Sequence, residues 1–356
     1  MITMAVKKIG ISRELIIHPG ETIADVLEER GITQAELAAR TGVSTAYVSN
    51  VIAGKKDISA NFAFDLEYAL RVPKAFWLNL QANYDAELLE FNKEKSITEE
   101  ERKVRESLKD IVKYLRQKGK LPIGEKKDES ILSLRKELQI SNLACLKDIV
   151  PKGVFKMANN AIDPYVLGAW IMMCQNMADN QRNYSQFDIL RVDQLIDAIK
   201  IIMQNPTANV QKELKETMAC YGIDFSVVRK FRGAPVQGYI NQKKDKTYQM
   251  VLAIKGAYAE IFWFSLFHEL GHIVNGDIGK TNKFVDDGTD KEKEIAADLF
   301  ARDKIIDKDK YTEFINRNDY SIEAIKQFAE SQKVMPYMVI GRLQKEKYLD
   351  YIGKSL

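Results

Sequence analysis

The sequence of 356 residues predicts a mostly helical α+β protein with more than one domain. Short helix-like segments separated by glycines fill the first 87 residues, and longer helical patterns follow up to about residue 220. Segments rich in Val, Ile, Tyr and Phe at 223–228, 236–240 and 248–254 indicate the strands of a small sheet. The length also exceeds what one hydrophobic core usually covers. We therefore expect three regions, an all-α domain at 1–87, a helical linker or intermediate region at 88–220, and a domain with a small β-sheet at 221–356.

Composition and charge are those of an ordinary globular chain. Apolar residues make up 46% and charged residues 29%, and a net charge of +3 is too small to indicate nucleic-acid binding by itself. The three cysteines form no paired motif, which is typical of a reducing compartment. The most apolar stretch, 165–174, is about half the roughly 20 residues that a membrane-spanning helix needs. The first residues lack a signal-peptide pattern, so we expect a soluble, cytoplasmic protein with no membrane partner.

Within the first domain, the turn chemistry predicts two short helices joined by a tight turn. Thr33 and Glu36 have the spacing of a capping box, so one helix begins just after Thr33. Gly42 supplies the unusual backbone of the turn, and Ser44 is a favoured cap for the next helix. The pattern predicts a helix-turn-helix in which residues 45–52 form the recognition helix.

This stretch resembles the XRE/Cro-type repressor domains, and the preceding His18-Pro19-Gly20-Glu21 is similar to the HigA-type antitoxins. The resemblance covers about residues 10–87. It implies binding to double-stranded operator DNA, with a homodimer on paired half-sites. The start of the recognition helix would face base edges in the major groove, and flanking residues would face phosphates. The expected base contacts are Thr45, Ala46 and Asn50, and the expected phosphate contacts are Gln34, Lys55 and Lys56.

The charge of the first domain leaves a second interpretation open. Residues 1–87 contain nine Lys or Arg against eleven Asp or Glu, so the domain has no strong basic surface. A helix-turn-helix of this kind can also serve as a protein-binding or dimerising scaffold.

The most informative motif lies in the last domain, where His268-Glu269-Leu270-Gly271-His272 has the pattern H-E-x-x-H. Two of the chain's three histidines are in this motif. On a helix, residues four apart lie on one face, so both imidazoles can reach a single tetrahedral zinc ion. Glu269 would then lie where it can take a proton from a zinc-activated water.

The surrounding sequence supports a buried zinc helix with a third ligand nearby. An apolar run at 261–267 precedes the motif, and Asn275-Gly276 is a favourable helix end. A zinc ion in a catalytic site takes three protein ligands and a water. Glu294 and Asp298 lie four apart on the next predicted helix, so Glu294 can bind the metal while Asp298 orients a ligand histidine. Glu292, Asp286 and Asp287 are the alternative oxygen ligands.

The Glu-x-x-x-Asp arrangement is similar to that of gluzincin peptidases. The sequence Phe-Trp-Phe-Ser-Leu-Phe-His-Glu-Leu-Gly-His at 262–272, with Ala-Asp-x-Phe-Ala at 297–301, resembles the ImmA/IrrE family of zinc endopeptidases over about residues 220–306. The resemblance implies a zincin-like domain with Zn²⁺ as cofactor. Family members commonly carry a second glutamate where this chain has Ala296. If the family's metal ligand is the first glutamate, Glu294 here, the site is complete. If the ligand is the second glutamate, the site in this chain lacks one ligand.

The resemblance implies hydrolysis of a peptide bond, in which Glu269 takes a proton from the attacking water and passes it to the leaving amine. The sequence does not identify the donor to the oxyanion, for which Tyr258 is a nominee. We expect a DNA-binding regulator with a zinc-dependent endopeptidase domain that cleaves a regulatory protein, such as a repressor or toxin, in a prophage, stress-response or toxin–antitoxin circuit. The alternative is a HigA-like antitoxin or repressor whose zincin domain is a non-catalytic sensor or partner-binding scaffold.

Overall fold

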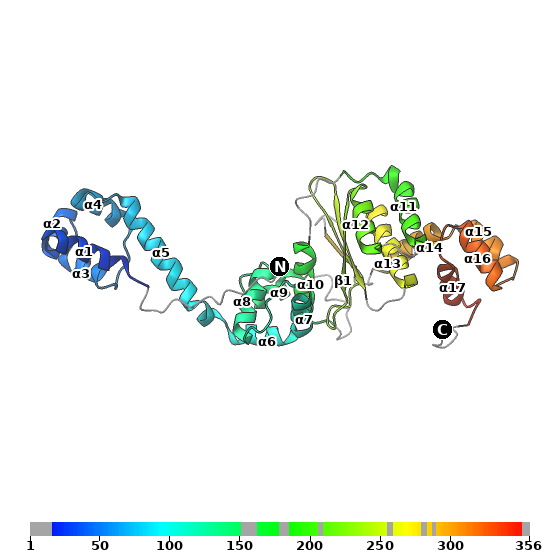
Figure 1. Ribbon diagram of the computed structural model, residues 1–356, viewed down its shortest axis with the longest axis horizontal. Helices are drawn as coiled ribbons and strands as arrows, with labels where there is room; N and C mark the ends of the chain where they lie inside the picture. Colours follow the sequence, from blue (N-terminus) through cyan, green and yellow to red (C-terminus); the bar gives the residue numbers. More distant parts are fainter. Residues whose placement is uncertain are drawn as a thin grey trace. The chain divides into compact units, whose positions relative to one another are not determined.

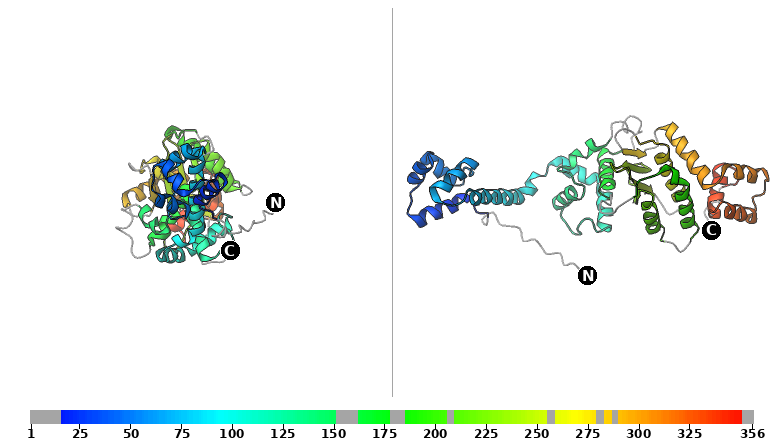
Figure 2. Two further views of the ribbon diagram at one scale, coloured as in Figure 1. Left: turned by 90° about the vertical axis from the view of Figure 1, so that its left-hand side faces the viewer. Right: turned by 90° about the horizontal axis from the view of Figure 1, so that it is seen from above.

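The computed structural model describes residues 16–150, 162–177, 185–205, 209–254, 259–278, 283–286 and 290–350. The chain divides into two compact units, Met1–Glu99 and Glu100–Leu356, and Figures 1 and 2 show their elements. Within the described residues, no helix has the length and hydrophobicity needed to span a bilayer.

The first unit is helical throughout its described part. Residues in its core come from every α-helix and include the fully buried Ile23, Leu37, Val48, Leu66 and Trp77. The elements are α1 (Pro19–Arg30), α2 (Gln34–Thr41), α3 (Thr45–Ile52), α4 (Ala60–Leu70), α5 (Lys74–Asn92) and the short 3₁₀ helix η2 (Lys93–Ser96).

Local capping explains where these helices begin and end. The Thr33 hydroxyl accepts a hydrogen bond from the Glu36 backbone N–H at 3.1 Å, and the Ser44 hydroxyl accepts one from Tyr47 at the same distance. Gly42 ends α2 with a φ of 71°, in the left-handed region that glycine tolerates best. The predicted helix-turn-helix is therefore confirmed. Only the Thr33 half of the predicted capping box forms, because the Glu36 carboxylate instead pairs with Arg40.

Helices also form the first part of the second unit, and a buried ion pair joins two of them. Arg135 donates through Nε and Nη2 to the Glu101 carboxylate, which is fully buried and also accepts from the Leu143 N–H. The elements are α6 (Glu99–Ser107), α7 (Lys109–Gln117), α8 (Lys127–Glu137), η3 (Leu143–Cys145), α9 (Leu146–Ile149), α10 (Pro164–Asn176), η5 (Ile189–Arg191), α11 (Val192–Gln204) and α12 (Val210–Ala219).

A mixed four-stranded sheet follows, with the strand order β1-β3-β2-β4. Strand β1 (Ile223–Arg229) runs parallel to β3 (Tyr248–Ile254), whereas β2 (Gly238–Gln242) is antiparallel to both β3 and β4 (Lys283–Asp286). In the register, Gly238 lies opposite Leu252 on one side and Asp286 on the other.

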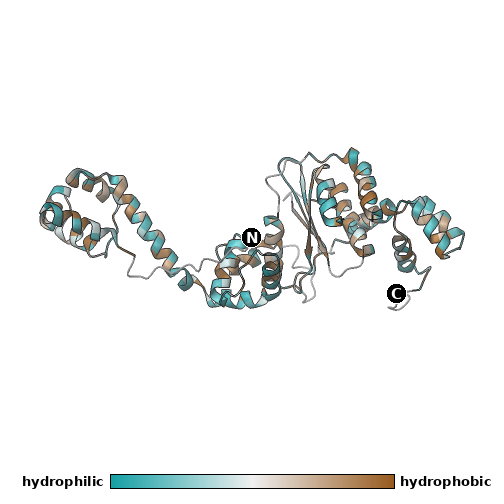
Figure 3. Cartoon of the chain, viewed as in Figure 1, coloured by the Kyte–Doolittle hydropathy of each residue, from teal (hydrophilic) through white to brown (hydrophobic). Residues whose placement is uncertain are grey.

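Helices cover both faces of this sheet, which explains why the central strand β3 is buried along nearly its whole length. On one face, Met250 and Leu252 join a core that contains residues of α11, α12 and α13 (Ala259–Val274). On the other face, the Gln249 side chain donates a hydrogen bond to the Cys174 carbonyl of α10 at 2.6 Å. Figure 1 shows these two layers, and Figure 3 shows that α11 carries its hydrophobic residues on one side.

The last described helices lie against α13 or against one another. Helix α14 (Lys291–Ile305) lies against α13, and α17 (Pro336–Lys345) contacts both α13 and α16 (Ile322–Ser331). Helix α15 (Lys308–Asn316) completes this part, and its Tyr311 lies in the same core.

The predicted fold class, mostly helical with a small sheet, is confirmed, with two differences in detail. Strand β4 was not predicted, because a four-residue strand among polar residues gives no alternating pattern. The compact units divide at Glu99 rather than at residue 87, because α5 continues across that position to Asn92. From Glu100 onward, the predicted intermediate region belongs to the same unit as the sheet.

Candidate functional site

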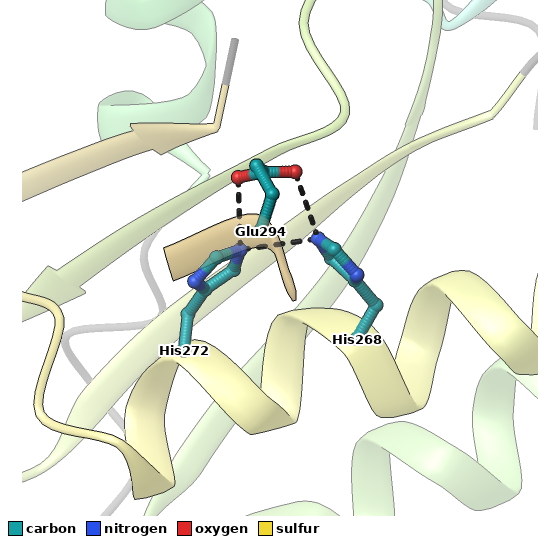
Figure 4. Close-up of side chains that lie close together, drawn as sticks. All are labelled: His268, His272 and Glu294. Atoms are coloured by element: carbon teal, nitrogen blue, oxygen red, sulfur yellow. Dashed lines mark hydrogen bonds and ion pairs between the residues drawn. The ribbon is translucent and has the colours of Figure 1, made fainter. Parts of the chain in front are cut away.

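Helix α13 carries the H-E-x-x-H motif and is anchored by its apolar residues. Leu266, Phe267 and Leu270 are fully buried in the core under the sheet. His268 and His272 project from one face of this helix (Figure 4), with exposed fractions of 6% and 0%. Both imidazoles are therefore shielded from water by the protein around them.

Glu294 of α14 completes a compact group with the two histidines. The two Nε2 atoms lie 3.1 Å apart, and the Glu294 carboxylate lies 3.4 Å from His268 Nε2 and 3.5 Å from His272 Nε2. Figure 4 shows the carboxylate placed across the two rings. These three side chains offer one ligand atom each within a single small volume.

A second carboxylate lies behind each histidine. His268 Nδ1 is 2.8 Å from Asp298 Oδ1, and His272 Nδ1 is 2.8 Å from Asp277 Oδ2. A carboxylate at Nδ1 favours the tautomer that keeps its proton there, so the lone pair of each Nε2 faces the other and Glu294. The sequence placed Asp298 in this role, but it did not single out Asp277.

The position of Asp277 follows from how α13 ends. Gly276 has a φ of 74°, and its N–H donates a hydrogen bond to the Ile273 carbonyl. The N–H of the next residue, Asp277, donates to the His272 carbonyl at 3.0 Å. This pair of bonds is the Schellman motif, which folds the next residue back over the last turn of the helix. The Asn275-Gly276 signal in the sequence was therefore sufficient to place Asp277 near His272.

Two glycines permit the close approaches that shape the site. A Cβ at Gly271 would lie only 3.1 Å from the Ala297 Cα, so α13 and α14 touch through nearly bare backbone. A Cβ at Gly238 on β2 would lie 2.1 Å from both Cδ and Oε1 of Glu269. The fully buried Glu269 carboxylate can therefore lie against β2 only because residue 238 has no side chain.

The donor geometry fits a tetrahedral zinc ion. Ligands about 2.0–2.1 Å from a tetrahedral centre lie roughly 3.3 Å from one another. The two Nε2 atoms lie 3.1 Å apart, and each has a different oxygen of Glu294 beside it, Oε2 at 3.4 Å from His268 and Oε1 at 3.5 Å from His272, so all three distances are close to this value. Two nitrogen lone pairs and a carboxylate at such distances would repel one another without a cation between them, so the chemistry of the set also suits a metal.

The remaining predicted residues of this half have different positions. Glu292 is exposed on α14 and is not part of the metal-binding group. Asp286 belongs to β4, but its side chain is not among those described, and Tyr258 and Asp287 lie outside the described residues. Ala296 leaves the group intact, since Glu294 supplies its carboxylate.

The predicted DNA-contacting residues gather around α2 and α3. Gln34 is the first residue of α2, Thr45 and Ala46 are the first two of α3, and all three are exposed. Asn50 is half-buried near the end of α3, and its carbonyl accepts hydrogen bonds from the backbones of the two lysines that follow. These lysines are Lys55 and Lys56, both exposed, and the Lys56 ammonium lies 5.0 Å from the centre of the Tyr47 ring on α3.

Two family models match separate parts of the chain. Residues 23–77 match the family model described as Helix-turn-helix. Residues 168–323 match the model described as Peptidase U49. The second match contains the sheet, α13 and the Glu294 carboxylate, so the candidate metal-binding group lies in a peptidase-family region.

The similar proteins each match about a fifth of the chain. Virulence-associated protein A′ of Dichelobacter nodosus is 42% identical over 69 residues, which are 19% of this chain and 60% of that protein. The chain thus spans little more than half of this relative. Among solved structures, an addiction module antidote protein of a HigA family from Coxiella burnetii is 32% identical, covering 23% of this chain and 95% of its own, with a TM-score of 0.21. The antitoxin GraA is 33% identical, covering 23% and 94%, with a TM-score of 0.22.

Proposed function

We propose that this chain is a DNA-binding regulator whose second unit is a zinc-dependent endopeptidase that cleaves a regulatory protein. In this proposal the cleaved protein belongs to a prophage, stress-response or toxin–antitoxin circuit. One observation carries the proposal: a buried glutamate lies in the sequence between two histidines whose Nε2 atoms are 3.1 Å apart, and both carboxylate oxygens of the next helix's Glu294 lie within 3.5 Å of these nitrogens. The match to a peptidase family model over this region supports it.

In this proposal His268, His272 and Glu294 are the zinc ligands. A bound zinc ion would polarise a peptide carbonyl and lower the pKa of a water molecule at the site. Asp298 and Asp277 hold the two imidazole rings in orientation through Nδ1, at 2.8 Å each. Glu269 accepts the proton of the attacking water at its carboxylate and delivers it to the leaving amine. Because Glu269 is fully buried, this proton exchanges with the reactants rather than with bulk water.

The first unit would bring the peptidase to particular DNA sites. The exposed start of α3, with Thr45 and Ala46, is the part that enters the major groove in helix-turn-helix proteins. In this proposal Gln34 at the start of α2 and the exposed Lys55 and Lys56 bind phosphates on either side. The Helix-turn-helix match over residues 23–77 supports this part.

The decisive test measures zinc content and proteolysis in matched variants. Wild type should hold one zinc ion per chain and should cleave candidate repressors or toxins in a purified mixture. Glu269→Gln should keep the zinc and lose cleavage, and Glu294→Gln should lose zinc. Glu292→Gln is the control, since Glu292 is exposed on the same helix outside the group, and it should change neither.

Each outcome has a definite meaning. Purified protein without zinc would contradict the proposal that the second unit is a zinc-dependent peptidase. Zinc without proteolysis that depends on Glu269 would indicate a DNA-binding repressor or antitoxin with a non-catalytic zinc site.

DNA binding is tested separately with the DNA upstream of the chain's own coding sequence. Asn50→Ala should weaken binding by about 1–3 kcal/mol, and Lys55→Ala should lower the salt slope of log K by about one. Asn61→Ala, at an exposed position on α4, is the matched control and should bind as wild type does. If neither Asn50→Ala nor Lys55→Ala changes binding, α3 is not the recognition helix.

A further inference from the structure

A pocket of about 730 Å³ lies directly beside the candidate metal centre, enclosed by α13, α14 and α17. Asp298 lines this pocket, and the same carboxylate contacts His268. Gln237 lines it as well, and the next residue, Gly238, is the one that faces Glu269. The pocket is therefore next to the candidate centre, since one lining residue contacts His268 and another precedes the glycine that faces Glu269.

The walls of the pocket are branched apolar side chains that remain open to solvent. Ile261 of α13 is 51% exposed, and Ile295 and Leu299 of α14 are 60% and 42% exposed. Apolar side chains gathered in a concave site are typical of ligand pockets, and the volume lies within the range of such sites. It is large enough for more than one apolar side chain of a bound polypeptide.

The charges around the pocket cancel. Its lining contains three cations and three carboxylates. The Arg342 guanidinium pairs with Glu346 at 3.1 Å, and the Lys345 ammonium lies 4.7 Å from the centre of the Phe264 ring. A pocket with this balance has no excess charge with which to select an acidic or a basic side chain, and it favours an uncharged occupant.

We propose that this pocket binds bulky apolar side chains of the polypeptide substrate next to the bond that is cleaved, with Ile261, Ile295 and Leu299 as specificity-determining residues. As a substrate pocket it rests on the proposed function. Asp298 and Gln237 connect the pocket to the candidate centre, because the first contacts His268 and the second is adjacent in sequence to Gly238, which faces Glu269.

The test measures binding without catalysis. Zinc-loaded Glu269→Gln protein is titrated into fluorescein-labelled decapeptides of glycine and serine, which carry either a central Leu-Phe pair or a central Asp-Asp pair, and anisotropy is recorded. The Leu-Phe peptide should bind at least tenfold more tightly. Adding Ile261→Asn should weaken its binding about tenfold. Ile322→Asn, a substitution at an equally apolar, 72% exposed position on α16 outside the pocket, should leave it unchanged.

Equal binding of the two peptides, no binding of either, or no effect of Ile261→Asn would overturn the pocket assignment. The two proposals fail separately. An inactive wild type whose Glu269→Gln variant binds the Leu-Phe peptide, with loss on Ile261→Asn, would contradict the peptidase and keep an apolar peptide site. An active wild type with no preference for apolar residues would keep the peptidase and contradict the assignment of the pocket.

Discussion

Gly238→Ala is expected to destabilise the second unit through one contact, the one with the Glu269 carboxyl. The new Cβ would lie 2.1 Å from Cδ and Oε1 and 2.2 Å from Oε2, whereas ordinary contact begins at about 3.4 Å. The carboxyl would have to move by about 1.3 Å inside a fully buried site. Gly238 has no positive φ, so the backbone itself accepts alanine.

Overpacking of this kind costs about 1–3 kcal/mol. For a unit of this size, each kcal/mol lowers the melting temperature by roughly 2–4 °C. Thermal unfolding is followed by tryptophan fluorescence in a background in which Trp77 and Trp170 are replaced by Phe, so that the signal comes from Trp263 on the same helix as Glu269. Gly341→Ala is the matched control, because its Cβ would meet only the Glu260 side chain at 3.7 Å within helix α17. That variant should unfold at the wild-type temperature or slightly above it.

A double-mutant cycle isolates the contact. In a Glu269→Ala background the carboxyl is gone, so Gly238→Ala should cost little, and the coupling between the two substitutions should be about 1–3 kcal/mol. If Gly238→Ala costs the same in both backgrounds, the clash is not with Glu269 and the reasoning about this space is refuted. In the active protein, a displacement of about 1 Å should also lower kcat by about 100-fold with zinc content unchanged.

Three further predictions concern the metal centre and the helical part. Asp277→Asn should weaken zinc binding 10- to 100-fold in a chelator competition, because His272 loses the carboxylate that orients it; unchanged affinity would mean that this contact does not hold the ring. Arg135→Ala should cost about 3–5 kcal/mol in urea unfolding, because it strands the buried Glu101, whereas Arg102→Ala at the surface pair with Asp128 should cost no more than about 1 kcal/mol. Equal costs would contradict this ranking. Removal of zinc by a chelator should lower the melting temperature of the second unit and leave that of the first unchanged, since all three ligand side chains belong to the second.

The features that the sequence predicts well are those that depend on neighbours along the chain. Thr33, Gly42 and Ser44 determine their own helix ends through bonds to residues within a few positions, so the bounds of α2 and α3 follow from the sequence. The same is true of the His268 and His272 spacing on α13, and of the strand Tyr248–Ile254.

Features that depend on contacts between segments far apart in the sequence could not be predicted from the sequence. Phe284 of β4 lies 4.6 Å, centre to centre, from the His272 ring, but a strand of four residues is stabilised by its pairing with β2 rather than by its own pattern. Gly238 lies opposite Glu269 because β2 passes across α13, and nothing in the residues around position 238 indicates that approach. Asp277 lies between these two cases. The glycine before it predicts the end of α13, but the contact of its carboxylate with His272 depends on the conformation of the chain after that end.

The contact between Gly271 and Ala297 has a consequence for which ion the centre can select. Histidine and glutamate bind many divalent metals, so the donor types alone do not choose among them. What distinguishes a small tetrahedral ion from a larger one is the spacing of the donors, and here that spacing is set where two helix backbones touch. A methyl group added at position 271 would push α14 away from α13 by a few tenths of an ångström, and Glu294 on α14 would move away from the two histidines by a similar distance. In the proposed zinc site, metal preference would thus depend on a residue that has no side-chain donor atom, and a substitution there would change it while the three ligand residues stay the same.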